Sequence, residues 1–260
     1  GSWLSYSDQY DVLLQATRPS SDMLRGETGK RIIAYNATTM QQKWDRTIKY
    51  SNPLMLHHDR IITEHRAYSL LSGELIKRRD PITHEIIPWT YTRTKGCNYS
   101  IASEHMLSFR SSAAAFFDLN NNGGTGHFGG FKSGCTSNLI AANGVLNAPD
   151  YTRTCQCSFQ NQTSLALVHM PHVEYWTEND FKWSGNRVKQ VGINLGAPGD
   201  RRAGNGTLWL EYPVSGGPSP EIPVEIKGDK PNYIRRHSWF LEVSDSLPWV
   251  AASAVTDVSE

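Results

Sequence analysis

Four cysteines form the densest group of reactive side chains in this sequence of 260 residues. All four lie between positions 97 and 157: Cys97, Cys135, Cys155 and Cys157. An even number of cysteines is typical of a protein with disulfide bonds, which form in oxidising compartments. If the segment TCQCSF is a strand, Cys155 and Cys157 point to the same face, and a bond between them would be strained, so we expect each to pair with Cys97 or Cys135. A zinc site of four thiolates is the alternative, although zinc sites usually have CxxC rather than CxC.

A second candidate is the segment DLNNNGG, which matches the start of a calcium-binding loop. The side-chain oxygens of Asp118, Asn120 and Asn122 could converge on one calcium ion. The twelfth position of such a loop should be a glutamate, but it is Gly129 here. The turn chemistry of Asn and Gly therefore favours a plain hairpin turn, with calcium binding as the alternative.

A third candidate is the arginine pair of GAPGDRR, Arg201 and Arg202. Two guanidinium groups beside loop N–H groups could bind a carboxylate, a phosphate or an acidic sugar. A solvated turn is the simpler interpretation, because exposed arginines on Gly/Pro loops are ordinary surface residues. The sequence has no HExxH, GxSxG, P-loop or GxGxxG motif, so it predicts no catalytic residue.

Charge and hydropathy exclude two classes of partner. Lys and Arg number 26 against 25 Asp and Glu, so a polyanion held by electrostatic attraction, such as nucleic acid, is not expected. No apolar run approaches the roughly 18 residues of a membrane-spanning helix. The chain opens with GSW and enters a strand-like run at once, so we expect it to be a fragment of a longer protein.

The elements that would position these residues are β-strands. Short apolar runs alternate with turns rich in Gly, Asn and Ser, which predicts an all-β fold. Two sets of landmarks recur along the chain. The residues before apolar strands are Asp59, Glu104 and Asn143, and the residues that end apolar runs before polar turns are Tyr35, Tyr68 and Phe117. Their mean spacing is close to the roughly 40 to 50 residues of a four-stranded propeller blade.

The segment RIIAYNATTMQQKWDRTI resembles the strand, turn and tryptophan of PQQ-like β-propeller repeats. In that family the tryptophan docks between blades, and Trp44 has this place here. The stretch 97–170 is similar to the cysteine-bearing closing blades of large secreted bacterial proteins with such repeats. The family includes quinone-dependent alcohol dehydrogenases as well as non-catalytic assembly scaffolds. The enzymes place a disulfide of adjacent cysteines against the quinone, whereas Gln156 separates Cys155 from Cys157, so PQQ is not the expected ligand.

These observations predict two parts. Residues 1–175 would form a partial propeller of about four PQQ-like blades, and residues 176–260 a smaller β-sandwich-like appendage. The boundary is placed where the polar run with Trp176, Phe181 and Trp183 suggests a strap between two units. The appendage is loosely similar to malectin-like carbohydrate-binding modules.

We therefore expect a non-catalytic, extracytoplasmic interaction or assembly module without a cofactor. Its partners would be other blades or domains of the same protein, or a separate protein, because an open propeller must cover its edges. One alternative is that these blades close a PQQ-like oxidoreductase that binds calcium and PQQ. The other alternative is carbohydrate binding by the C-terminal part.

Overall fold

The computed structural model describes residues 2–17, 30–48, 50, 53–94, 96–133, 139–149, 163–183, 185–228, 230–241 and 247–259. These residues form 22 strands with one 3-10 helix, η1 (Ser238–Phe240), and one α-helix, α1 (Pro248–Ala251). The predicted all-β class is confirmed.

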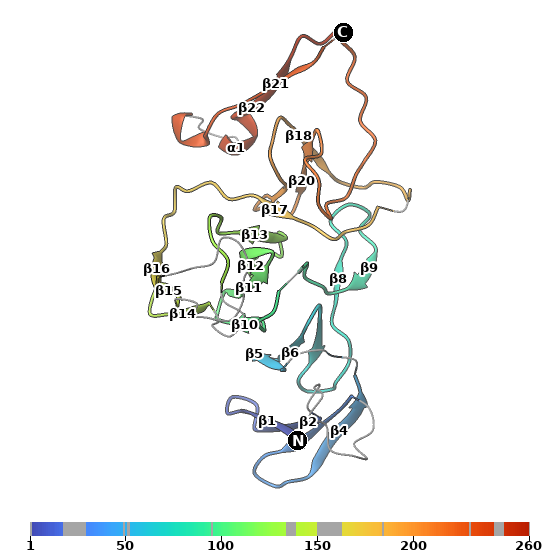
Figure 1. Cartoon of the computed structure of the whole chain (residues 1–260). Helices are drawn as coiled ribbons and strands as arrows, with labels where there is room; N and C mark the ends of the chain where they lie inside the picture. Colours follow the sequence, from blue (N-terminus) through green and yellow to red (C-terminus); the bar gives the residue numbers. More distant parts are fainter. Residues whose placement is uncertain are drawn as a thin grey trace.

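Four antiparallel sheets follow one another along the first two thirds of the chain (Figure 1). The first sheet has the order β1-β2-β3-β4: β1 (Ser2–Ser7), β2 (Val12–Thr17), β3 (Arg31–Asn36), β4 (Gln42–Thr47). The second has three strands: β5 (Met55–His57), β6 (Arg60–Thr63), β7 (Arg66–Ser69). The third has five: β10 (Ile101–Ala102), β11 (Met106–Ser111), β12 (Ala113–Asp118), β13 (Thr125–His127), β17 (Thr177–Glu178). The fourth has three: β14 (Ile140–Ala142), β15 (Val145–Ala148), β16 (Leu165–Val168).

The four sheets pack face to face in chain order. Neighbouring residues of a strand point to opposite faces, and on β6 Ile61 packs against the first sheet while Ile62 packs against the third. The third sheet is covered in the same way, because Ala114 of β12 packs against Leu146 of the fourth sheet. Each inner sheet therefore has two buried faces, as consecutive blades of a propeller do.

One turn geometry recurs four times. In each turn the first residue accepts at least one backbone N–H on its side-chain oxygen, and the residue four positions later has a positive φ and donates its N–H to the first residue's carbonyl. The four turns are Asn36 to Met40, Ser69 to Gly73, Asp80 to His84 and Asp118 to Asn122. Tyr35, Tyr68 and Phe117 directly precede three of these turns, and Asp59, Glu104 and Asn143 lie in the β5–β6, β10–β11 and β14–β15 turns. The sequence landmarks thus mark structurally equivalent positions.

The C-terminal part is built on smaller sheets. A mixed sheet has the order β18-β20-β19, in which β18 and β20 are parallel, and β21 pairs with β22. Their bounds are β18 (Gly192–Leu195), β19 (Arg201–Arg202), β20 (Leu208–Tyr212), β21 (Asn232–Arg235) and β22 (Ser253–Thr256). The remaining hairpin, β8 (Lys77–Arg79) with β9 (Ile86–Pro88), lies between the second and third sheets in the chain.

The predicted boundary between residues 175 and 176 falls just before β17, which belongs to the third sheet. Contacts cross it in both directions. Ile82 of the β8–β9 turn is part of a core cluster with Phe181, Leu208 and Leu210. The Thr177 hydroxyl donates to the Gly123 carbonyl at 2.6 Å. The two predicted parts therefore share packing.

Candidate functional site

The first sheet buries one face and exposes the other. Its buried face packs against the second sheet through residues such as Val12, Leu14, Ile32 and Trp44. Two rows of paired residues cross the opposite face: Leu4, Gln15, Ile33, Asp45 and Tyr6, Leu13, Tyr35, Gln42. We call the apolar members of these rows the outer face: Leu4, Tyr6, Leu13, Ile33 and Tyr35. A blade between two neighbours would have this pattern, with apolar residues on both faces.

The outer face is open to solvent. The exposed fraction is 66% for Leu4 and 55% for Tyr6, while its other members are half-buried. The polar groups of these rows are already paired: Gln15, which stands between Leu4 and Ile33, accepts from the Tyr35 hydroxyl, and Asp45 forms an ion pair with Arg31. A largely apolar face whose polar groups are already hydrogen-bonded or ion-paired suits a protein interface.

The buried contact on the other side of the first sheet shows how neighbouring sheets lock together. The indole N–H of Trp44 donates to the Leu70 carbonyl at 2.9 Å, in the turn that begins at Ser69. A Cβ at Gly73 in that turn would lie 2.9 Å from the Trp44 ring. The sequence-based expectation that Trp44 docks between blades is confirmed.

A second tryptophan binds a recurrent turn one step further along the stack, but it uses a side-chain acceptor instead of a backbone carbonyl. Trp89 donates its indole N–H to the Asn122 side-chain oxygen at 2.6 Å, in the turn that begins at Asp118. In both cases a tryptophan that precedes a sheet binds the recurrent turn of that sheet. We call this contact between a tryptophan and the turn of the next sheet the tryptophan lock. In both locks the tryptophan comes before the turn in the chain.

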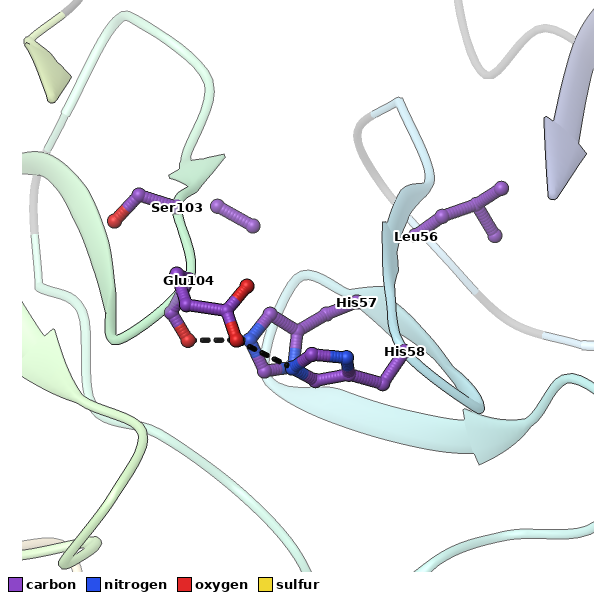
Figure 2. A pocket seen from close by; sticks show the side chains of 6 residues that line it. Leu56, His57, His58, Ser103 and Glu104 are labelled. Atoms are coloured by element: carbon purple, nitrogen blue, oxygen red, sulfur yellow. Dashed lines mark hydrogen bonds and ion pairs between the residues drawn. The ribbon is translucent and has the colours of Figure 1, made fainter. Parts of the chain in front are cut away.

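A small hollow lies where the second and third sheets meet, between the β5–β6 and β10–β11 turns (Figure 2). Its volume is about 230 Å³ and its lining residues are Leu56, His57, His58, Ala102, Ser103 and Glu104. His57 Nε2 lies 2.9 Å from the Glu104 carbonyl oxygen, and His58 Nε2 lies 3.1 Å from Glu104 Oε1. The His58 and Glu104 side chains are 49% and 64% exposed, so their ion pair contributes little stability. The hollow therefore lies beside a contact that joins two adjacent turns, and its polar groups are engaged in that contact.

The cysteine prediction falls mostly on residues that the structure does not describe. Cys97 lies exposed in the loop before β10. Cys135, Cys155 and Cys157 are outside the described residues, and the disulfide and zinc alternatives remain predictions. Across the described part of the chain, no group of three or more His, Cys, Asp or Glu side chains is arranged to hold a metal ion.

The three residues of the predicted calcium loop lie in the turn between β12 and β13. Asp118 Oδ1 accepts the Asn120 N–H at 2.8 Å, and the Asn122 oxygen accepts from Trp89. Asn120 itself is exposed. These bonds are those of a capped turn that also receives the Trp89 indole, and calcium binding remains an untested alternative.

Arg201 and Arg202 form β19 and are half-buried, so the expected solvated turn is not observed. The Arg201 guanidinium lies 4.6 Å from the ring centre of Tyr175 and 5.0 Å from that of Trp249. Arg202 donates to the Asn121 and Gly206 carbonyls at 3.0 and 3.1 Å. Arg201 therefore packs between aromatic rings, while Arg202 connects the C-terminal part to the β12–β13 turn.

A buried acidic centre was not identified from the sequence. Asp200 has no exposed surface and accepts hydrogen bonds from the Asn179 side chain at 3.0 Å and the Glu211 N–H at 3.1 Å. Burial raises the pKa of Asp200 to about 6, against the opposing effect of its hydrogen bonds with Ser219, Asn179 and Glu211. No local motif marks Asp200, because its surroundings come from distant segments.

Comparison with known proteins adds little. No protein-family model and no curated protein matches the chain. Among solved structures, the crystal structure of BamB from Moraxella catarrhalis is similar, with a TM-score of 0.34 and 15% sequence identity over 56% of this chain. The chain spans 42% of that BamB chain. A likeness of this size assigns neither a family nor a function. No helix in the described part of the chain is long and apolar enough to cross a membrane.

Proposed function

We propose that this chain is a non-catalytic interaction module of an extracytoplasmic protein, in which stacked blades form a scaffold for assembly. The observation that carries the proposal is the exposed outer face of the first sheet. Contiguous apolar patches on soluble proteins usually mark interaction sites. This patch extends across three adjacent strands of one sheet, β1, β2 and β3, rather than consisting of isolated residues.

The scaffold supports this role because it is fixed by specific contacts. The Trp44 and Trp89 locks and the shared apolar cores hold each sheet against the next. A surface that is rigid before binding loses little conformational entropy when a partner docks. The extracytoplasmic location is proposed from the predicted disulfides, which form and persist in oxidising compartments.

A quinone assay separates this module from an enzyme that binds PQQ. PQQ and calcium are added to the purified chain, and an artificial dye reports electron transfer from an alcohol. We expect neither saturable quenching of cofactor fluorescence nor alcohol-dependent dye reduction. Saturable PQQ binding together with dye reduction would replace the module with the oxidoreductase.

A further inference from the structure

We infer that the outer face docks an antiparallel β-sheet of a partner polypeptide, and that this sheet carries a tryptophan equivalent to Trp44. The inference rests on the proposed function, since it names the partner of that interaction surface. The bound partner sheet would extend the stack that the four sheets already form.

The first argument is continuity with the observed interfaces. The second and third sheets each bury both faces between neighbouring sheets. The first sheet has the same two-faced apolar pattern, yet Leu4 and Tyr6 on its outer face are more than half exposed. A partner that buries these residues must itself have a flat apolar face, and a second β-sheet provides one.

The second argument comes from the direction of the tryptophan lock. The turn that begins at Ser69 receives the Trp44 indole N–H on the Leu70 carbonyl, and the turn that begins at Asp118 receives the Trp89 indole N–H on the Asn122 side chain. The turn of the first sheet, from Asn36 to Met40, has the same backbone hydrogen bond and the same positive φ. Leu70 follows Ser69 as Ala37 follows Asn36, so the Ala37 carbonyl is equivalent to the carbonyl that binds Trp44.

The exposure of Met40 in this turn is consistent with a turn that has no tryptophan docked on it. Met40 occupies the position of Gly73 and is 58% exposed, whereas Gly73 lies against the Trp44 ring. A flexible methionine side chain can pack on an aromatic ring. The turn thus offers an acceptor and an apolar contact for an indole, at the edge of the outer face.

The polar groups of the face indicate how the partner binds. Arg31 and Asp45 neutralise each other, and Gln15 pairs with Tyr35. Long-range charge attraction would contribute little to docking, so binding should depend weakly on salt. Burial of apolar surface and the tryptophan lock would provide the affinity.

The test uses the full chain, extended at its N-terminus by a copy of residues 2–54. This copy supplies a four-stranded sheet with its own Trp44 and the natural connection to the next sheet. A reporter, Leu4→Cys, is placed only in the original sheet, and its reaction with a maleimide is followed by peptide mass spectrometry. The matched control reporter is Ile140→Cys on the fourth sheet, which is 46% exposed and distant in the stack.

We expect the extension to slow labelling at position 4 at least tenfold and to leave labelling at position 140 unchanged. Trp44→Ala in the copy alone should restore most of the labelling at position 4. A second measurement uses Leu4→Asp with Tyr6→Asp in the original sheet. This pair should lower the melting temperature of the extended chain by several degrees and that of the unextended chain by much less.

Equal labelling of the extended and unextended chains would overturn the inference, and so would a copy that stays unfolded by circular dichroism. A stable dimer of the unextended chain that protects position 4 would also overturn it, by identifying a second copy as the occupant. These failures remove only the docking surface. Quinone-dependent dye reduction would instead remove the module itself, so the two proposals fail separately.

Discussion

Asp200 shows how a single residue can tie stability to pH. Burial raises its pKa from the ordinary value near 4 to about 6. Between these two values the folded protein keeps a proton on Asp200 that the unfolded chain has released. Stability linked to this group is therefore fully present below about pH 4 and is lost as the pH rises through about 6.

We predict that Asp200→Asn removes this dependence. A pKa difference of this size corresponds to about 3 kcal/mol. The free energy of unfolding of the wild type, relative to that of the variant, should fall by up to this amount between pH 4 and pH 7. The neutral amide can still accept the Glu211 N–H, and the Asn179 amide can rotate to match it. Urea denaturation at several pH values measures the difference, and a constant difference would show that Asp200 ionises normally.

Residues with local signals were predictable, and residues defined by distant partners were not. Trp44 was predicted because the strand, turn and tryptophan pattern lies within one short segment. Arg201 was expected to be solvated, because its Gly/Pro loop gives no sign of Tyr175 or Trp249. Asp200 gave no signal at all, since burial is a property of the folded chain.

At the scale of elements, the recurrent turn and the tryptophan lock set the register between blades. Gly73 has φ +70°, and a Cβ there would lie 2.8 Å from Arg46 Cγ and 2.9 Å from Trp44 Cε3. Gly144, in the β14–β15 turn, has φ +76°, but a Cβ added there would meet no atom within 4 Å. The two glycines therefore share the backbone requirement and differ in packing.

We predict that Gly73→Ala is more destabilising than Gly144→Ala. Each substitution places alanine in the left-handed region, which costs about 1 kcal/mol. Gly73→Ala also forces Trp44 away from its turn, which should add about 1–3 kcal/mol. Chemical denaturation of the two variants gives the comparison. Equal losses would mean that the Trp44 ring does not rest on Gly73.

The sequence revealed the repeats but not the whole pattern of elements. Tyr35, Tyr68 and Phe117 were found because an apolar run ends at each of them. The turn from Asp80 to His84 has the same geometry, yet it follows the Ser69 turn too closely to fit the repeat spacing. Its hairpin, β8–β9, is a separate two-stranded sheet, and its structural role is evident only from its contacts.

For the molecule as a whole, that hairpin decides how the two predicted parts are related. Ile82 in the β8–β9 turn is 1% exposed, and its core neighbours are Phe181, Leu208 and Leu210. The Ile82 carbonyl also accepts the Lys189 N–H at 2.8 Å. A residue of the predicted propeller segment thus belongs to the core of the C-terminal part. The sequence could not show this, because the contact joins segments that are far apart along the chain.

We predict that Ile82→Ala destabilises the C-terminal part, although it lies outside residues 176–260. Burial loss and the cavity should cost about 2–5 kcal/mol. Amide hydrogen exchange in β20 (Leu208–Tyr212) should then become at least tenfold faster, since about 1.4 kcal/mol corresponds to a factor of ten.

The matched control is Ile61→Ala, because Ile61 is equally buried but packs between the first and second sheets. This variant should speed exchange in β6 and leave β20 close to the wild-type rate, since local openings of a structure are governed by the contacts of each cooperative unit. If Ile82→Ala leaves exchange in β20 unchanged, the C-terminal part is an independent unit with its boundary at residue 175. If it accelerates exchange in β20 as expected, the β8–β9 hairpin joins the stacked blades to the C-terminal sheets, and truncation at residue 175 would expose the apolar surface around Ile82.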